Sequence, residues 1–345
     1  MAERVYLDWN ATAPLRPEAR TAMIAAMDVA GNPSSVHLEG RAAKGLVERA
    51  RAQVAAAFGA SASDVVFVSG ATEAAALAMA GRDLASAPIE HEAVAAWGDG
   101  TLVVGGDGRV AVRDPSRTAL QLANSETGVL QELPDGLAVS DMTQAFGKMS
   151  CAFDWSGVEM ALISAHKLGG PKGIGALVLR RGVEVTARIR GGGQEMGRRS
   201  GTENIAGIAG FGAAAEAAAG DVERDAWKRV AELRTFLETS LEGADNPTIL
   251  VGKESRRLPN TSCLVTPGWK GETQVMALDL AGFAVSAGSA CSSGKVRESA
   301  VLRAMGFGPG EADCAIRVSL GPDTTEEQVA RFVHAFRRLR DRRRT

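Results

Sequence analysis

The sequence has few cysteines and few histidines, and neither set forms a pattern typical of a metal site. Its four cysteines include no C-x-x-C pair, which argues against a disulfide framework and against a zinc ribbon. Its four histidines form no H-x-x-H or H-E-x-x-H motif, so catalysis by a bound metal has no support. We therefore expect reduced thiols, a cytoplasmic location and no metal.

The chain also lacks an excess of charge of either sign. It has 39 Lys and Arg against 41 Asp and Glu, a net charge of −2, whereas nucleic-acid-binding proteins usually carry a strong basic excess. No uncharged apolar run reaches the ~18 residues that span a bilayer, and the first residues do not resemble a secretion signal. We expect neither a nucleic-acid partner nor a membrane segment.

The composition that remains is that of a globular chain. Its 345 residues are 45% hydrophobic and 23% charged, enough for about two domains of roughly 100–200 residues each. Strand and helix patterns alternate along the chain, which favours an α/β architecture. We place the domain boundary near Gly220, where an alanine-rich helix predicted over 205–219 ends.

A helix, a strand and a second helix are predicted in the first quarter of the chain. The first helix, 41–58, is stopped by Gly59, and a buried strand over 64–69 leads through Gly70 into the second helix, 72–80. Free N–H groups at such a helix start often bind an anion. Further helices are predicted at 224–242 and 325–341, and further strands at 101–104, 118–123, 137–140, 160–164 and 174–180.

Polar groups follow several of these strands where the strands end. They are the segment 124–126 (Asn-Ser-Glu), Asp141, and the pair His166 and Lys167. Because ligands of open parallel sheets bind outside the carboxyl ends of the strands, we expect a functional site at this edge.

Four of the candidate residues each allow more than one interpretation. Lys167, among small apolar neighbours, could form a Schiff base with an aldehyde cofactor, although a lone lysine is usually a surface group. Asp141 could pair with a pyridine nitrogen or cap a helix, and Gln144 could donate to a cofactor oxygen or complete a capping box with Asp141. His91 could stack on a cofactor ring, act as a base, or be structural.

A thiol and an arginine in the last quarter of the chain are also candidates. Cys291 lies in a Gly/Ser/Ala-rich loop, where an exposed thiol could be a nucleophile, whereas Cys151, Cys263 and Cys314 lie beside apolar residues and are predicted to be buried. Arg317, within a strand-like run, could hold a substrate carboxylate or form an internal salt bridge.

These pieces together resemble the cysteine desulfurases, class V pyridoxal-phosphate enzymes of fold type I. The resemblance implies a large domain, 13–220, with a mostly parallel, seven-stranded type of sheet, and a smaller α+β domain formed by 1–12 and 221–345. The blocks that carry it are YLDWNATAPLRPEA, GNPSSVHLEGRAA, VFVSGATEAAALA, IEHEAV, NSETGVLQ, DMTQAFGK, SAHKLGGPKGIGAL, GGGQEMGRRSGT, AVSAGSACSSG and AIRVSLGPDTTEEQV.

The resemblance also implies a cofactor site for pyridoxal 5'-phosphate. Lys167 would hold the cofactor covalently, Asp141 would pair with its ring nitrogen, His91 would stack on the ring, and Gln144 would reach the ring hydroxyl. Thr202 would reach the phosphate of a neighbouring subunit, which implies a homodimer. The phosphate would be surrounded by Ala71, Thr72, Ser164 and His166.

For the reaction, the resemblance implies removal of sulfur from L-cysteine. Arg317 would hold the substrate carboxylate, with Asn124 beside it, and Cys291 would take the sulfur as a persulfide and release alanine. The sulfur would pass to an acceptor protein such as an iron–sulfur scaffold. A selenocysteine or cysteine-sulfinate lyase, a class V aminotransferase, and a non-catalytic scaffold of the same fold are the alternatives.

The chain departs from the family at two places. Ser125 stands where the family usually has an asparagine that contacts the cofactor hydroxyl, so either Asn124 compensates or that contact is lost. The chain is also short around 80–120 and 131–141, where the turn at 134–137 leaves no room for a helix between two strands.

Overall fold

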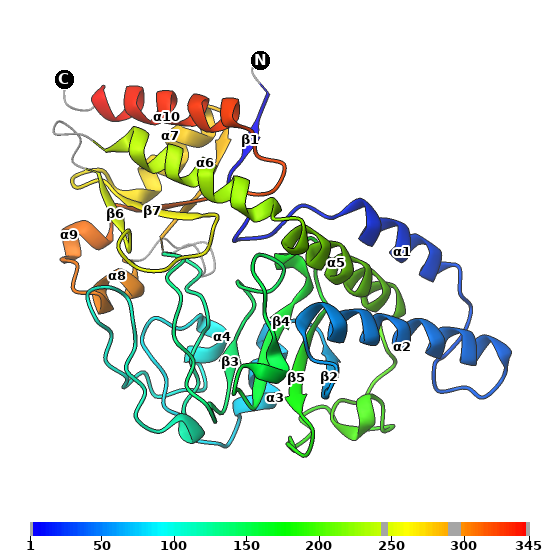
Figure 1. Cartoon of the computed structure of the whole chain (residues 1–345). Helices are drawn as coiled ribbons and strands as arrows, with labels where there is room; N and C mark the ends of the chain where they lie inside the picture. Colours follow the sequence, from blue (N-terminus) through cyan, green and yellow to red (C-terminus); the bar gives the residue numbers. More distant parts are fainter. Residues whose placement is uncertain (1–2, 243–247, 289–297, 343–345) are drawn as a thin grey trace.

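A computed structural model describes residues 3–242, 248–288 and 298–342, which form two four-stranded sheets, each beside its own hydrophobic core, and one two-stranded sheet (Figure 1). The first sheet has the strand order β2-β5-β4-β3. β5 is antiparallel to both of its neighbours, whereas β4 and β3 are parallel. The strands are β2 (Ser63–Val68), β3 (Ser140–Asp141), β4 (Met160–Ser164) and β5 (Gly175–Arg180).

Beyond β3 the sheet continues through single parallel bridges. Val139 pairs with Ala119, Thr118 pairs with Ala85, and Leu84 pairs with Gly98. Three more segments therefore lie beside the four strands, and β5 is the strand that runs against the others. This arrangement confirms the expected mostly parallel α/β sheet.

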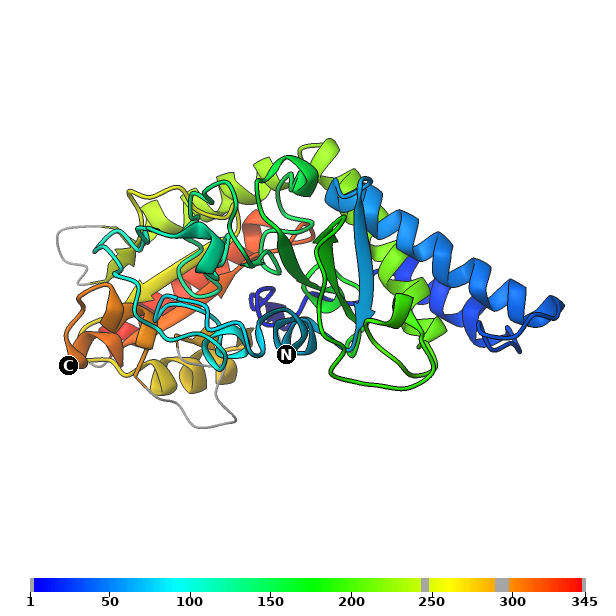
Figure 2. The ribbon, with the colours of Figure 1, turned by 90° about the horizontal axis from the view of Figure 1, so that it is seen from below.

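Alternate residues of the strands face two helical layers, as the period of two in a strand requires. Val65 and Phe67 of β2 pack with the helices α2 and α5, whereas Val66 and Val68 pack against α3. α2 and α5 lie side by side (Figure 2). The helices of this part are α1 (Pro17–Met27), α2 (Leu38–Phe58), α3 (Ala71–Met79), α4 (Glu92–Ala95) and α5 (Ile205–Glu223).

The second sheet has the order β6-β7-β10-β9 and is antiparallel throughout. The N-terminal strand β1 (Val5–Tyr6) pairs in parallel with β8 (Phe283–Ala284), so the start of the chain packs with this part. The remaining strands and helices are β6 (Ile249–Val251), β7 (Thr261–Val265), β9 (Ser286–Ala287), β10 (Ala315–Ser319), α6 (Ala226–Leu241), α7 (Gly271–Leu280), α8 (Ala300–Ala304), α9 (Pro309–Ala312) and α10 (Glu326–Asp341).

The helices α2 and α5 do not begin or end at all of the predicted residues. α2 begins at Leu38, three residues before the predicted start, because His37 Nδ1 accepts a hydrogen bond from the backbone N–H of Gly40. It ends at Gly59, with φ +64°, as predicted. α5 continues past Gly220 to Glu223, so the helix does not end at the predicted boundary.

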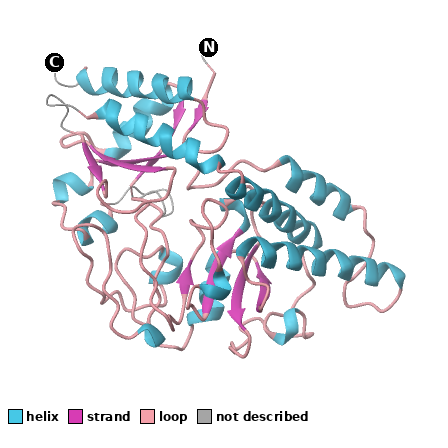
Figure 3. Ribbon diagram, viewed as in Figure 1, coloured by secondary structure: helices cyan, strands magenta, loops and turns pink. Residues whose placement is uncertain are grey.

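Two predicted strands, 101–104 and 118–123, are wrong as continuous strands, and of the predicted strand 137–140 only Ser140 belongs to a strand, β3. The first two segments contain bends and make only single bridges, and most of 96–139 is loop (Figure 3). No helix occurs in the described stretch 118–141, in agreement with the compression expected there. α5 is long and apolar enough to span a membrane by length and composition alone, but it forms a wall of the first core.

Candidate active site

A cavity of about 560 Å³ opens at the carboxyl edge of the first sheet. The end of β2, the end of β3, the end of β4 and the turn before β5 all contribute to its wall. The structure therefore brings together most of the residues predicted from strand ends and from the resemblance. Those that line it are Ala71, Thr72, His91, Ser125, Asp141, Gln144, Ser164, His166 and Lys167.

The start of α3 supplies the cavity with backbone N–H groups. No side chain caps this helix, whose first residues Ala71 and Thr72 line the cavity. Gly175 of β5 packs directly behind, since a Cβ atom there would lie 2.8 Å from Gly70 Cα and 2.6 Å from Ile163 O. Uncapped N–H groups at a helix start favour an anionic group such as a phosphate.

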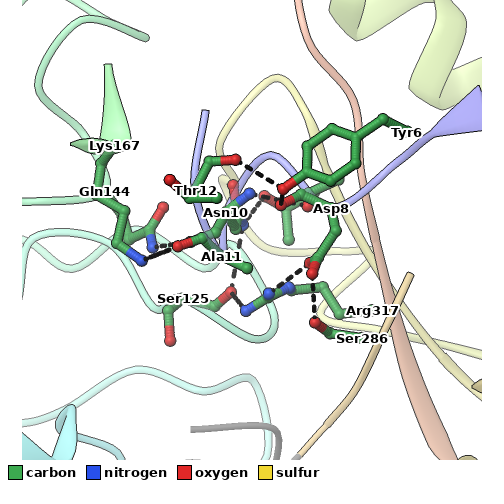
Figure 4. A network of polar contacts seen from close by, with 12 residues as sticks. Tyr6, Asp8, Asn10, Ala11, Thr12, Ser125, Gln144, Lys167, Ser286 and Arg317 are labelled. Atoms are coloured by element: carbon green, nitrogen blue, oxygen red, sulfur yellow. Dashed lines mark hydrogen bonds and ion pairs between the residues drawn. The ribbon is translucent and has the colours of Figure 1, made fainter. Parts of the chain in front are cut away.

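Lys167 reaches the cavity from the short 3-10 helix η3 (Ala165–Lys167) that follows β4. Its Nζ donates to Asn10 O and Ala11 O, both over 2.8 Å (Figure 4). The N-terminal segment thus holds the amine through backbone carbonyls. An amine at the wall of a cavity can react with an aldehyde once a ligand enters.

His166, beside Lys167, is held neutral at physiological pH. Burial, together with the nearby charges of Lys167, Lys172 and His91, lowers its pKa from 6.5 to about 4. Its Nδ1 lies 3.2 Å from Thr12 Oγ1. A neutral imidazole can donate one hydrogen bond to an anion without adding a charge.

Asp141 and Gln144 lie on the segment that leaves β3. Asp141 Oδ1 accepts from the backbone N–H of Thr143 over 2.9 Å, so this carboxylate does form a local turn while it lines the cavity. Gln144 forms no capping box with Asp141. Its Nε2 donates instead to Asn10 O over 3.0 Å.

His91 lines the same cavity from the start of α4. Its Nδ1 accepts from the backbone N–H of Ala93 over 3.2 Å and caps the helix. Because Nδ1 is the acceptor, the neutral ring carries its proton on Nε2. The ring is fixed by this cap at the wall of the cavity.

A second cavity of about 220 Å³ adjoins the first and is lined by Arg317, Ser286, His91, Ser125 and Lys167 among others. Arg317 is 5% exposed, and its Nη2 donates to Asp8 Oδ1 over 2.8 Å. Its Nη1 donates to Ser125 O over 3.0 Å, and its buried Nε has no partner among the described residues. The internal salt bridge is therefore present. These two contacts use two of the five N–H donors of the guanidinium, and Nε is among those left for a ligand.

Two buried carboxyl groups support this region from behind. Glu90 accepts the backbone N–H of Gln121, and burial raises its pKa well above the usual value, with the charge of Asp141 adding to the rise. Burial raises the pKa of Glu126 to about 7, although the Ser299 hydroxyl and Arg317 act in the opposite direction.

Some predicted residues are not at the cavity. The Asn124 side chain is committed to a turn, since its Oδ1 accepts from the N–H groups of Glu126 and Thr127 and its Nδ2 donates to Ile89 O. Thr202 is exposed and does not line this cavity, but it lines a smaller pocket that shares Ser69 and Gly173 with it. Cys291 lies outside the described residues.

Two of the three described cysteines are buried as predicted, whereas Cys151 is only partly buried. Cys263 and Cys314 are buried in the core of the second sheet, and burial raises the pKa of the Cys263 thiol well above its usual value. Burial raises the pKa of Cys151 to about 12. Thiols with raised pKa values are poor nucleophiles.

The sequence interpretation missed three polar residues that hold the site together. Asp8 pairs with Arg317, Asn10 accepts from Lys167, and Lys148 donates to both Asn10 and Gln144. A local signal existed for the last contact alone, since Lys148 follows Gln144 by four residues.

A cavity at strand carboxyl ends with a lysine, a carboxylate and an uncapped helix start defines an α/β enzyme that binds an anionic small molecule. The aminotransferase class-V family matches residues 5–95 and 114–332, and the chain belongs to this family. The expected family and fold class are thereby confirmed.

Relatives that cover almost the whole chain agree with this assignment. A cysteine desulfurase of Cereibacter sphaeroides is 40% identical over 97% of this chain and 95% of its own. A cysteine desulfurase IscS of Dictyoglomus turgidum is 34% identical over 100% and 96%. Among solved structures, a NifS-like protein from Rickettsia africae has a TM-score of 0.89 and 31% identity, with 98% and 100% covered.

Proposed function

We propose that this chain is a pyridoxal-phosphate-dependent cysteine desulfurase. It would take sulfur from L-cysteine, release L-alanine and hold the sulfur as a persulfide on Cys291. The observation that carries the proposal is the joined pair of cavities, with Lys167, Asp141 and the start of α3 in one and Arg317 in the other. The relatives named cysteine desulfurase support the same reaction.

The donor set of the larger cavity fits pyridoxal phosphate. Ala71 and Thr72 present backbone N–H groups for a phosphate, with Ser164 and the neutral His166 beside them. Bound pyridoxal phosphate supplies an aldehyde and an electron sink for negative charge formed next to the substrate amine. The Asp141 carboxylate would hold a proton on the ring nitrogen.

The other residues of the larger cavity would hold the ring. Gln144 would donate to the ring hydroxyl, Lys167 would provide the amine that attaches the cofactor, and the fixed His91 ring would stack on the cofactor. Asn124 is engaged in its turn, so we propose that Ser125, which lines both cavities, leaves the family's asparagine contact unmade.

The smaller cavity would hold the amino acid. Arg317 would bind the substrate carboxylate through its Nε and an Nη group, an arrangement that suits a planar guanidinium. The carbon–sulfur bond of cysteine breaks as a bond forms between that sulfur and Cys291 Sγ. A thiol and cysteine give a persulfide and alanine, so no oxidant or reductant is required.

The proposal extends to the oligomeric state, the sulfur acceptor, the location and the domain division of the protein. A homodimer, in which Thr202 reaches the neighbouring subunit's phosphate, a sulfur-acceptor protein, and a cytoplasmic location remain predictions. Two separate cores support a large domain, 13–220, and a small domain, 1–12 with 221–345.

Alanine release from L-cysteine tests this proposal. The purified full chain should be yellow after addition of pyridoxal phosphate and should release alanine, and Cys291→Ala should abolish that release. Unchanged release by Cys291→Ala would refute the persulfide step. If Cys291→Ala still released alanine from selenocysteine but no longer from cysteine, the lyase would be favoured, and a chain that stays colourless would indicate a non-catalytic scaffold.

A further inference from the structure

Lys148 is a buried amine at the back of the larger cavity. It is 2% exposed, and among the described residues it forms no ion pair. Its Nζ donates to Gln144 Oε1 and to Asn10 Oδ1, each over 2.7 Å. A lysine is almost never fully buried unless it is paired, so its place against two amide oxygens calls for an explanation.

Asn10 is fixed by contacts on every side. Its Oδ1 also accepts from Asn260 Nδ2, and its Nδ2 donates to Ser125 O and Thr261 Oγ1. These contacts allow one orientation of the Asn10 amide. Asn10 is therefore a rigid partner for Lys148.

Gln144 has a single satisfied orientation as a result. Its Oε1 accepts from Lys148, and its Nε2 donates one N–H to Asn10 O. The opposite orientation would place Oε1 against the Asn10 carbonyl oxygen, two acceptors facing each other. This argument holds whether Lys148 is charged or neutral, because a neutral amine still has two N–H groups for its two acceptors.

Gln144 consequently presents a hydrogen-bond donor, the second N–H of its Nε2, to the cavity. Gln144 lines both cavities, and among the described residues the second N–H of Nε2 has no protein acceptor. Figure 4 shows Gln144 beside Lys167 and Ala11, where a cofactor attached to the lysine would lie. An N–H at this point matches a ligand that presents an acceptor oxygen.

We propose that Lys148 is a positioning residue that holds the Gln144 amide with its N–H toward the cavity. The site then selects a cofactor with an acceptor oxygen at this position, such as the ring hydroxyl oxygen of pyridoxal phosphate. This inference rests on the proposed function, since it assigns a role to a residue that does not touch the cofactor.

The test compares two cofactors in the full chain freed of cofactor. The probes are pyridoxal phosphate and its 3-deoxy analogue, which lacks the ring hydroxyl, and the readout is the ratio of their dissociation constants. Lys148→Met should lower the preference for pyridoxal phosphate by roughly 3- to 10-fold, the usual effect of one hydrogen bond. A purely structural lysine would weaken both cofactors equally, and an unchanged ratio would overturn the proposal.

Lys172→Met is the matched control, because Lys172 is exposed and lines the same cavity but does not contact Gln144. In Lys172→Met the ratio of the two dissociation constants should equal that of the wild type. If the preference for pyridoxal phosphate fell as much in Lys172→Met as in Lys148→Met, the role of Lys148 would be overturned. A wild-type chain that binds neither cofactor would overturn the proposed function and this inference with it.

A second variant covers the case in which Lys148→Met does not fold. Gln144→Glu gives Lys148 a carboxylate partner and should fold, but both carboxylate oxygens are acceptors. It should therefore lose the preference for pyridoxal phosphate over the deoxy analogue. A retained preference would show that no donor is required from Gln144 and would overturn the proposal.

Discussion

Arg317 and Asp8 form a part-buried ion pair across 309 residues of sequence, with Nη2 and Oδ1 2.8 Å apart. Asp8 also accepts from the Ser286 hydroxyl, and Arg317 lines the smaller cavity (Figure 4). The two interpretations of Arg317 are thus compatible, because the internal salt bridge orients the guanidinium that would receive the substrate carboxylate.

Removal of the Asp8 charge should cost stability. Asp8→Asn leaves the nearly buried Arg317 without its counter-charge, and we expect the free energy of unfolding to fall by about 3 kcal/mol. Urea denaturation measures the change. Arg4→Ala, which breaks the exposed pair of Arg4 with Asp279, is the control and should cost less than about 1 kcal/mol. Equal losses of unfolding free energy in Asp8→Asn and Arg4→Ala would contradict the claim that burial makes the Arg317–Asp8 pair the costlier one to break.

Gly175→Ala should damage both stability and cofactor binding. The new Cβ would lie 2.6 Å from Ile163 O and 2.8 Å from Gly70 Cα, so the start of α3 must shift. We expect a loss of 1 to 3 kcal/mol, on the order of other overpacked sites, and weaker binding of pyridoxal phosphate. Gly45→Ala in α2 meets no atom within 4 Å and should be neutral or stabilising. Equal stability of the two variants would refute the close-approach argument.

Protonation of His166 should destabilise the protein in acid. Its pKa is lowered from 6.5 to about 4 in the folded state, so the unfolded chain binds more protons between these values. The stability that the neutral ring contributes is present above pH 6.5 and is lost as the pH falls toward 4. In urea denaturation at several pH values, His166→Gln should be less sensitive to this fall than the wild type. His334→Gln, on the exposed face of α10, should retain the wild-type slope.

Glu126 should have the opposite dependence on pH. Its pKa is raised from 4.5 to about 7 by burial, so the folded state binds more protons between these values. Its contribution to stability is full below pH 4.5 and is lost as the pH rises through 7, by roughly 3 kcal/mol. Glu126→Gln removes this term, so the stability of the wild type relative to the variant should decline as the pH rises from 4.5 to 7. A pH-independent difference would contradict the raised pKa.

The elements with strong local patterns could be predicted from the sequence. The helices at 38–58 and 71–79 and the strands β2, β4 and β5 have clear periodicity or apolar runs, with glycines at their ends. The segments 101–104 and 118–123 have similar apolar runs but make only single bridges: Val104 pairs with the nearby Val110, whereas 118–119 pair with residues 20 or more positions away.

The same distinction holds for the site. Lys167 and Asp141 were predicted because they follow strands, and the geometry of a sheet brings strand ends together. Asp8 and Asn10 could not be predicted, since their contacts join residues far apart in the sequence. For Lys148, the contact with Gln144 had a local signal, but the contact with Asn10, 138 residues away, had none.

Mass spectrometry of the full chain after brief exposure to L-cysteine tests the central claim most directly. The account predicts an added sulfur atom on the peptide that contains Cys291, and none on Cys151, Cys263 or Cys314, whose surroundings disfavour the thiolate or bury the thiol. Alanine release with no added sulfur on Cys291, or with sulfur on one of the other three cysteines, would contradict it.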